Sequence, residues 1–147
     1  MNCIRFARGY KYQLRAPYVI VLPEIRPEHG AGTEWLTLEP DGTLTIRAGY
    51  AWDGASGPTI DTRDSMRASL VHDALYQLMR LRMLEHSYRP AVDLIFRRLC
   101  EQDGMWSPRA ALWYHAVRIF ADPASEPGAE SPDDTAGCGC PPAPAEV

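Results

Sequence analysis

The spacing of hydrophobic residues changes from a strand-like alternation in the first third of the chain to a helical period in the rest. Residues 4–6 and 18–22 are short apolar runs, and the second is rich in β-branched residues, which favours a strand. Prolines on both sides of the second run indicate that its strand is short or lies at a sheet edge. Residues 35–38 and 43–47 alternate on either side of a Pro-Asp-Gly turn, and this pattern predicts a β-hairpin.

The pattern changes after the hairpin from strand to loop. We expect the second hairpin strand to continue to Trp52, so that Asp53 lies at a strand end. Residues 53–64 hold two glycines, a proline and three aspartates, a composition typical of a loop. Asp64 or Ser65 is a natural N-cap for the helix that follows.

Three amphipathic helices are predicted after this loop. The first spans residues 65–84, where apolar residues recur at spacings of three and four. The second spans residues 90–102, with a proline in its first turn and Gly104 as its stop. The third begins with a Ser-Pro pair at residue 107 and runs to about residue 121. Its predicted buried side consists of Leu112, Ala116, Ile119 and Phe120.

The composition changes again at residue 122. The remaining residues are mostly proline, alanine, glycine and acidic residues with little to bury, which is typical of a disordered or partner-docking tail. The sequence therefore predicts a single α+β domain over residues 1–121 and a Pro-rich tail over residues 122–147. Within the domain, an N-terminal antiparallel β-hairpin or small sheet is followed by three helices.

Length, charge and cysteine content limit the classes of function. The 147 residues, 46% of them hydrophobic, are enough for one domain with a core. The formal net charge of −4 argues against nucleic acid as the main partner, because phosphate binding needs a basic surface. No run approaches the about 18 apolar residues of a membrane span, and the start lacks the apolar core of a secretory signal. No disulfide framework or zinc site is expected from the four cysteines, since Cys138 and Cys140 have no second pair nearby.

The first predicted helix carries a histidine–aspartate pair, His72 and Asp73, with Tyr76 one turn later. A histidine can act as a general base near neutral pH, but its other ring nitrogen needs an orienting carboxylate. Asp73 points about 100° away around the helix and is poorly placed for this. Asp93 lies beside the apolar stripe of the next, antiparallel helix, where an unpaired charge is costly to bury. We therefore predict that His72 and Asp93 are partners.

The loop before this helix is a candidate cation site. Calcium takes about six to eight oxygen ligands, and glycines let a loop wrap around the ion. Such an ion would polarise a substrate carbonyl while His72 activates a water molecule. The same residues would also suit a purely structural role, with His72 bonded to a buried backbone group. The expected catalytic residues are His72, Asp93 and Tyr76, and the expected calcium ligands are Asp73, Asp53, Gly54 and Ser56.

Four segments of the chain resemble a small bacteriophage and prophage family known as domain-of-unknown-function family 1353. They are GYAWDGASGP, ASLVHDALY, AVDLIF and WYHAVR, in this order along the chain. The resemblance covers most of residues 1–121. It implies an origin in a phage or prophage, and it brings no settled activity with it.

A second, local resemblance concerns the candidate site. SGPTIDTRD followed by HDALY is similar to the calcium loop and catalytic helix of secreted phospholipase A2, although the cysteines that flank that helix in the family are missing. The resemblance implies that His72 is the base and Asp73 a calcium ligand. It also implies that Asp93 is the supporting acid and Tyr76 a supporting tyrosine.

Three functions are therefore expected. The first is calcium-assisted ester hydrolysis, like that of phospholipase A2, on lipid or other envelope material for a phage. The second is a non-catalytic virion component, such as a tail or baseplate part, whose C-terminal tail docks on other virion proteins. The third is a metal-dependent hydrolase acting on a peptidoglycan bond or a phosphoester. In each case we expect synthesis in the cytoplasm of the infected bacterium, followed in the second by incorporation into the virion.

Overall fold

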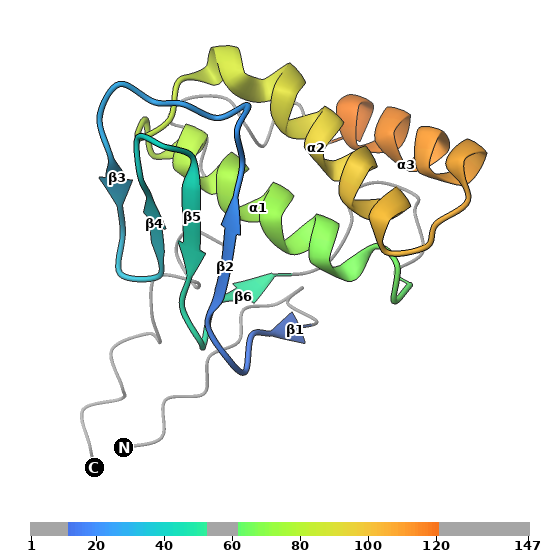
Figure 1. Cartoon of the computed structure of the whole chain (residues 1–147), viewed down its shortest axis with the longest axis horizontal. Coiled ribbons are helices and arrows are strands. Elements are labelled where there is room, and N and C mark those ends of the chain that lie inside the picture. Colours follow the sequence, from blue (N-terminus) through green and yellow to red (C-terminus); the bar gives the residue numbers. More distant parts are fainter. Residues whose placement is uncertain (1–11, 53–61, 121–147) are drawn as a thin grey trace.

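The structure, a computed structural model, describes residues 12–52 and 62–120, with strands in the first part and helices in the second (Figure 1). Two antiparallel sheets precede three helices, which confirms the predicted α+β class. The larger sheet has the strand order β2-β5-β4-β3, and the smaller pairs β1 with β6. The strands are β1 Tyr12–Gln13, β2 Tyr18–Val21, β3 Ala31–Gly32, β4 Leu36–Leu38, β5 Thr43–Ile46 and β6 Ala51–Trp52. The helices are α1 Met66–Arg80, the short 3₁₀ helix η1 His86–Tyr88, α2 Arg89–Gln102 and α3 Ser107–Phe120.

The predicted hairpin is present as β4 and β5, and it supplies the sheet side of the core. Leu36 pairs with Ile46 and Leu38 with Leu44, and all four side chains are buried. The threonines between them point to the opposite face of the sheet. The buried face belongs to one hydrophobic cluster with residues of α1 and α2, and Figure 1 shows α1 crossing behind the strands.

The hairpin turn depends on Gly42. Its φ of +87° lies in the left-handed region, and an added Cβ would lie 2.2 Å from the carbonyl oxygen of Leu22 and 2.7 Å from that of Ile25. The substitution Gly42→Ala is therefore expected to lower the free energy of unfolding by about 2–3 kcal/mol, through backbone strain and displacement of the neighbouring strand. Chemical denaturation measures this loss.

Gly104→Ala is the matched control for this prediction. Gly104 also has a positive φ, +102°, but an added Cβ there would meet nothing within 4 Å. It should cost only about 1 kcal/mol, which is the conformational penalty alone. Equal losses in the two variants would contradict the steric argument for Gly42.

The prediction that the second hairpin strand continues to Trp52 is wrong. β5 ends at Ile46, and the chain turns at Gly49, which has a φ of +99°. After this turn, Ala51 and Trp52 pair with β1 in a separate sheet. A glycine in the left-handed region interrupts the extended backbone, so the run of strand-forming residues becomes two strands. The predicted strand at residues 4–6 lies outside the described residues.

The helices begin where the sequence indicates, but two residues of one predicted buried face are exposed. Pro90 lies in the first turn of α2, and Gly104 follows its end with a positive φ, as predicted. In α3, Ala116 is buried as predicted, but Leu112 is 61% exposed and Ile119 is 68% exposed. The side chain of Phe120 lies outside the described residues. The side that packs instead carries Ala110, Trp113 and Val117, because the large indole of Trp113 buries more apolar surface than either aliphatic residue.

The described helices bear on two further predictions, which concern the end of the first helix and membrane-spanning segments. α1 ends at Arg80, four residues before the predicted end, and Arg82 has a φ of +61°. None of the described helices is long and apolar enough to cross a membrane.

Candidate functional site

Helices α1 and α2 bring His72, Tyr76 and Asp93 together in the core. The Nε2 atom of His72 lies 2.8 Å from Oδ1 of Asp93, and the hydroxyl of Tyr76 donates to the same oxygen at 2.5 Å. His72 and Tyr76 are each 2% exposed, and Asp93 is 0% exposed. His72 and Asp93 are thus hydrogen-bonded partners, as the apolar surroundings of Asp93 indicated; their chemical roles stay predictions.

The imidazole of His72 is held by two aromatic rings. The ring of Tyr76, one turn along α1, lies 4.0 Å from it between centroids. Phe96 approaches from α2 in an edge-to-face arrangement at 5.4 Å. Positions separated by three or four residues share a helix face, so His72 and Tyr76 both face α2, while Asp93 and Phe96 both face α1. The ring is therefore fixed by packing as well as by its hydrogen bond.

Two arginines surround the other oxygen of Asp93. Oδ2 is buried and accepts no hydrogen bond from the described residues. Nη1 of Arg118 lies 3.6 Å away and Nε of Arg89 3.9 Å away. Arg89 also donates from Nη2 to the backbone carbonyl of Arg118 at 2.7 Å, which links α2 to α3. Two guanidinium groups thus compensate the buried carboxylate.

Neither arginine was predicted to belong to this site. The contact of Arg89 with Asp93 could have been predicted from the sequence, because Arg89 lies four residues before Asp93 on the same helix face. No pattern in the sequence indicates the contact of Arg118, because its approach to Asp93 depends on how α3 packs against α2.

Asp73 lies on the other side of His72. Its Oδ1 atom is 3.9 Å from Nδ1 of the imidazole, and its side chain is 22% exposed, unlike that of Asp93. The two nitrogens of His72 therefore face different surroundings. Nε2 contacts the fully buried carboxylate of Asp93, and Nδ1 faces the partly exposed carboxylate of Asp73.

Segment 50–52 is attached to the face of α1 that carries Asp73. Trp52 donates from Nε1 to Ser69 Oγ, and Tyr50 donates to Gln77 Oε1, each at 3.0 Å and both buried. Ser69, Asp73 and Gln77 are successive positions at i, i+4 and i+8 on one helix face. The chain that leads into residue 53 is thus held across this face.

One of the four predicted calcium ligands lies within the described residues. Asp53, Gly54 and Ser56 lie outside the described residues, and Asp73 lies beside His72. Within residues 12–52 and 62–120, no group of three or more histidine, cysteine or acidic side chains is arranged to hold a metal ion.

Burial and charge shift the pKa values at this site. Burial lowers the pKa of His72 most strongly, but the carboxylates of Asp73 and Asp93 outweigh it and raise the pKa above the ordinary value of 6.5. Burial and the hydrogen bond to Asp93 raise the pKa of Tyr76, so its hydroxyl remains a donor at all physiological pH values. At neutral pH, Tyr76 therefore donates to an acceptor that it shares with His72.

The raised pKa of His72 predicts a pH dependence of stability. A folded-state pKa above the unfolded value means that folding binds a proton, so the stabilisation is complete below about pH 6.5. It is lost as the pH rises through the folded-state pKa. We expect the free energy of unfolding of the wild type to fall over this alkaline range, and that of His72→Gln to lack this component. Parallel pH curves from chemical denaturation would contradict the shift.

The family match spans the elements that build this site. The family described as "Protein of unknown function (DUF1353)" matches residues 34–117. The chain belongs to this family. The DUF1353 match runs from just before β4 into α3, so it includes His72, Tyr76 and Asp93 but ends one residue before Arg118. No curated protein and no solved structure matches the chain.

Proposed function

We propose that this DUF1353 protein is a hydrolase in which His72 activates water for attack on an ester. The observation that carries the proposal is the asymmetric setting of the imidazole, with Nε2 bonded to Asp93 at 2.8 Å and Nδ1 turned toward Asp73. Because an ionised carboxylate only accepts hydrogen bonds, it favours the tautomer in which Nε2 carries the proton. The lone pair on Nδ1 is then available to take a proton from water.

Asp93 and Tyr76 act through His72 in this proposal. Asp93 fixes the orientation of the imidazole and stabilises its positive charge after proton transfer. Tyr76 donates to the same carboxylate oxygen and restricts its position. The positive charges of Arg89 and Arg118 lie beside the buried Asp93 side chain and offset its negative charge. Water and substrate would approach from the side of Asp73, since its carboxylate is partly exposed and that of Asp93 is buried.

The chemistry of the donors suits calcium. Asp73 offers a partly exposed carboxylate next to Nδ1 of His72, and a hard cation prefers such oxygen ligands. Asp53, Gly54 and Ser56 would complete the set with carboxylate, backbone and hydroxyl oxygens. When bound, the ion would polarise the ester carbonyl and stabilise its developing negative charge.

The substrate class follows from the two resemblances in the sequence. Together, the similarity of the His-Asp helix to phospholipase A2 and the phage resemblance favour a phospholipid ester of a bacterial envelope. The protein would be made in the infected bacterium and act for a phage or prophage.

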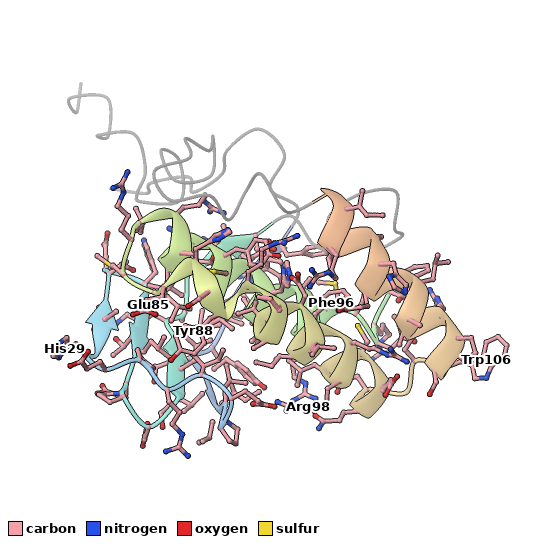
Figure 2. All side chains as sticks on the ribbon, turned by 90° about the horizontal axis from the view of Figure 1, so that it is seen from above. His29, Glu85, Tyr88, Phe96, Arg98 and Trp106 are labelled. Atoms are coloured by element: carbon pink, nitrogen blue, oxygen red, sulfur yellow. The ribbon has the colours of Figure 1, made fainter. Side chains whose placement is uncertain are left out.

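A virion component is the second candidate, and an exposed apolar surface favours it. Trp106, just before α3, is 75% exposed, and Figure 2 shows its side chain directed away from the molecule. Leu112 and Ile119 are also exposed on α3. Such residues suit contact with another protein. Under this candidate, the residues around His72 have only a structural role.

Phospholipid vesicles separate these candidates. We expect the wild type to release fatty acid in the presence of calcium and to stop when a chelator is added. Asp73→Asn should remove the response to calcium, because it replaces a charged ligand by a neutral amide while keeping the size of the side chain. Asp103→Asn is the matched control, because Asp103 is an acidic residue elsewhere on the domain that pairs with Arg67. A wild type that neither binds calcium nor hydrolyses any ester would refute the hydrolase and leave the virion candidate.

A further inference from the structure

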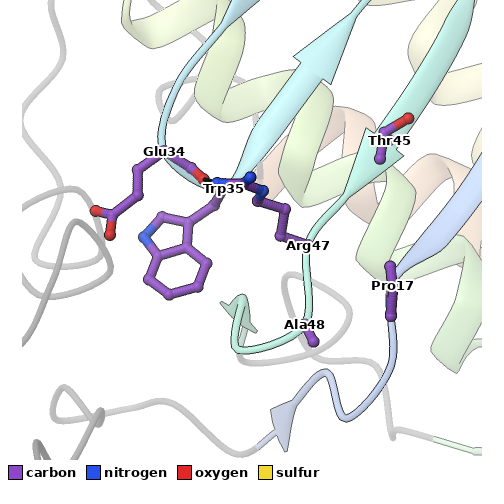
Figure 3. A pocket seen from close by; sticks show the side chains of 6 residues that line it. All are labelled: Pro17, Glu34, Trp35, Thr45, Arg47 and Ala48. Atoms are coloured by element: carbon purple, nitrogen blue, oxygen red, sulfur yellow. Dashed lines mark hydrogen bonds between the residues drawn. The ribbon is translucent and has the colours of Figure 1, made fainter.

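A pocket of about 550 Å³ opens beside the larger sheet, and its walls take no part in the His72–Asp93 pair (Figure 3). It lies where β4 begins and β5 ends, near the start of β2. Its volume is within the range of small-molecule sites. The described residues that line it are Pro17, Glu34, Trp35, Thr45, Arg47 and Ala48.

The indole of Trp35 is the main apolar wall, and the backbone holds it in place. Gly49 has a φ of +99°, and an added Cβ there would lie 2.8 Å from Cζ3 of Trp35, so the ring packs directly on the glycine. The backbone N–H of Arg47 also donates to the carbonyl of Trp35 at 2.9 Å. An aromatic surface that is fixed before binding costs a ligand little ordering entropy.

The polar walls carry both kinds of hydrogen-bonding group. Nη1 of Arg47 donates to the backbone carbonyl of Glu34 at 3.2 Å, which anchors the guanidinium at the rim and leaves further N–H donors on it. The carboxylate of Glu34 is an acceptor, and the hydroxyl of Thr45 both donates and accepts. In Figure 3 the indole lies beside the side chains of Glu34 and Arg47, while Pro17 and Ala48 lie across from it.

The charges of these walls select the class of ligand. Among the described residues that line the pocket, the carboxylate of Glu34 and the guanidinium of Arg47 balance each other, so these walls favour neither a phosphate nor a quaternary ammonium group. A neutral molecule with an apolar face and several hydroxyl groups fits best, because it can stack on Trp35 and meet donors and acceptors together. We propose that this pocket binds a saccharide, with one sugar ring stacked on Trp35 and its hydroxyls bonded to Glu34 and Arg47.

The test is a titration of the full chain with N,N′-diacetylchitobiose, a neutral disaccharide. We expect saturable binding that shifts the indole N–H resonance of Trp35. Glu34→Gln and Arg47→Gln, both at exposed positions, should each weaken binding several-fold, and Trp35→Ala should weaken it by about tenfold or more. Thr37→Ala, an exposed position on β4 outside the pocket lining, should bind like the wild type.

Three results would overturn this assignment. One is a wild type that binds neither diacetylchitobiose nor maltose. Another is binding that persists unchanged in Glu34→Gln and Arg47→Gln, which are not expected to disturb folding. The third is tighter binding of inorganic phosphate or choline than of either sugar. The proposal is independent of ester hydrolysis, so His72→Gln should still bind the disaccharide.

Discussion

Replacing Asp93 with alanine is expected to lower the free energy of unfolding by about 3–5 kcal/mol, because it breaks a buried charge cluster from one side. The carboxylate accepts hydrogen bonds from His72 and Tyr76 and compensates Arg89 and Arg118. Without it, a hydroxyl and an imidazole in the core lose their acceptor, and two guanidinium groups face each other without an anion. Chemical denaturation at neutral pH measures the loss.

Two further variants show whether charge or shape dominates this loss. Asp93→Asn keeps the size of the side chain and one carbonyl acceptor, so it isolates the loss of the negative charge. Arg118→Leu combined with Asp93→Leu removes charges from both sides, and we expect the pair to cost less than the sum of the single variants. Strictly additive losses, or a loss below about 1 kcal/mol in Asp93→Ala, would show that the cluster does not stabilise the fold.

The local part of this structure could be predicted from the sequence. The hairpin follows from Pro-Asp-Gly, because a left-handed glycine at residue 42 is what the turn requires. The contact between His72 and Asp93 follows from an energetic argument, since a carboxylate beside an apolar stripe needs a partner on the neighbouring helix. Both predictions rest on interactions between residues that are near in sequence or on adjacent elements.

The parts that were not predicted depend on packing between distant elements. Arg118 approaches Asp93 only because α3 packs against α2, with Trp113 and Val117 of α3 in the hydrophobic core. Because this side of α3 packs against the core, Leu112 and Ile119 are exposed, although the spacing of aliphatic residues predicted that they are buried. The pairing of β1 with β6 joins residues about 40 positions apart, and two-residue strands carry too little pattern to be recognised.

His72→Gln is expected to reduce ester hydrolysis by roughly 10²–10⁴-fold, because glutamine keeps the polarity of the site but cannot accept a proton from water. The loss should fall on kcat, since the imidazole acts on the attacking water. Tyr76→Phe is the graded control: it removes a hydrogen bond to Asp93 but leaves the base, so its loss should be much smaller. Equal activity of His72→Gln and the wild type would refute the role of His72 as base.

The pH profile gives this prediction a second, independent measurement. The base must be neutral, and the carboxylates of Asp73 and Asp93 raise the pKa of His72 above 6.5. Activity should therefore rise with pH, with a midpoint above 6.5, over the same range in which the stabilising contribution of His72 is lost. Asp93→Asn should move the midpoint toward lower pH, because the imidazolium loses its closest anion, while lowering kcat through poorer orientation of the ring. A structural role of Asp93 alone would lower activity without moving the midpoint, so the shift distinguishes a partner of the base from a support of the fold.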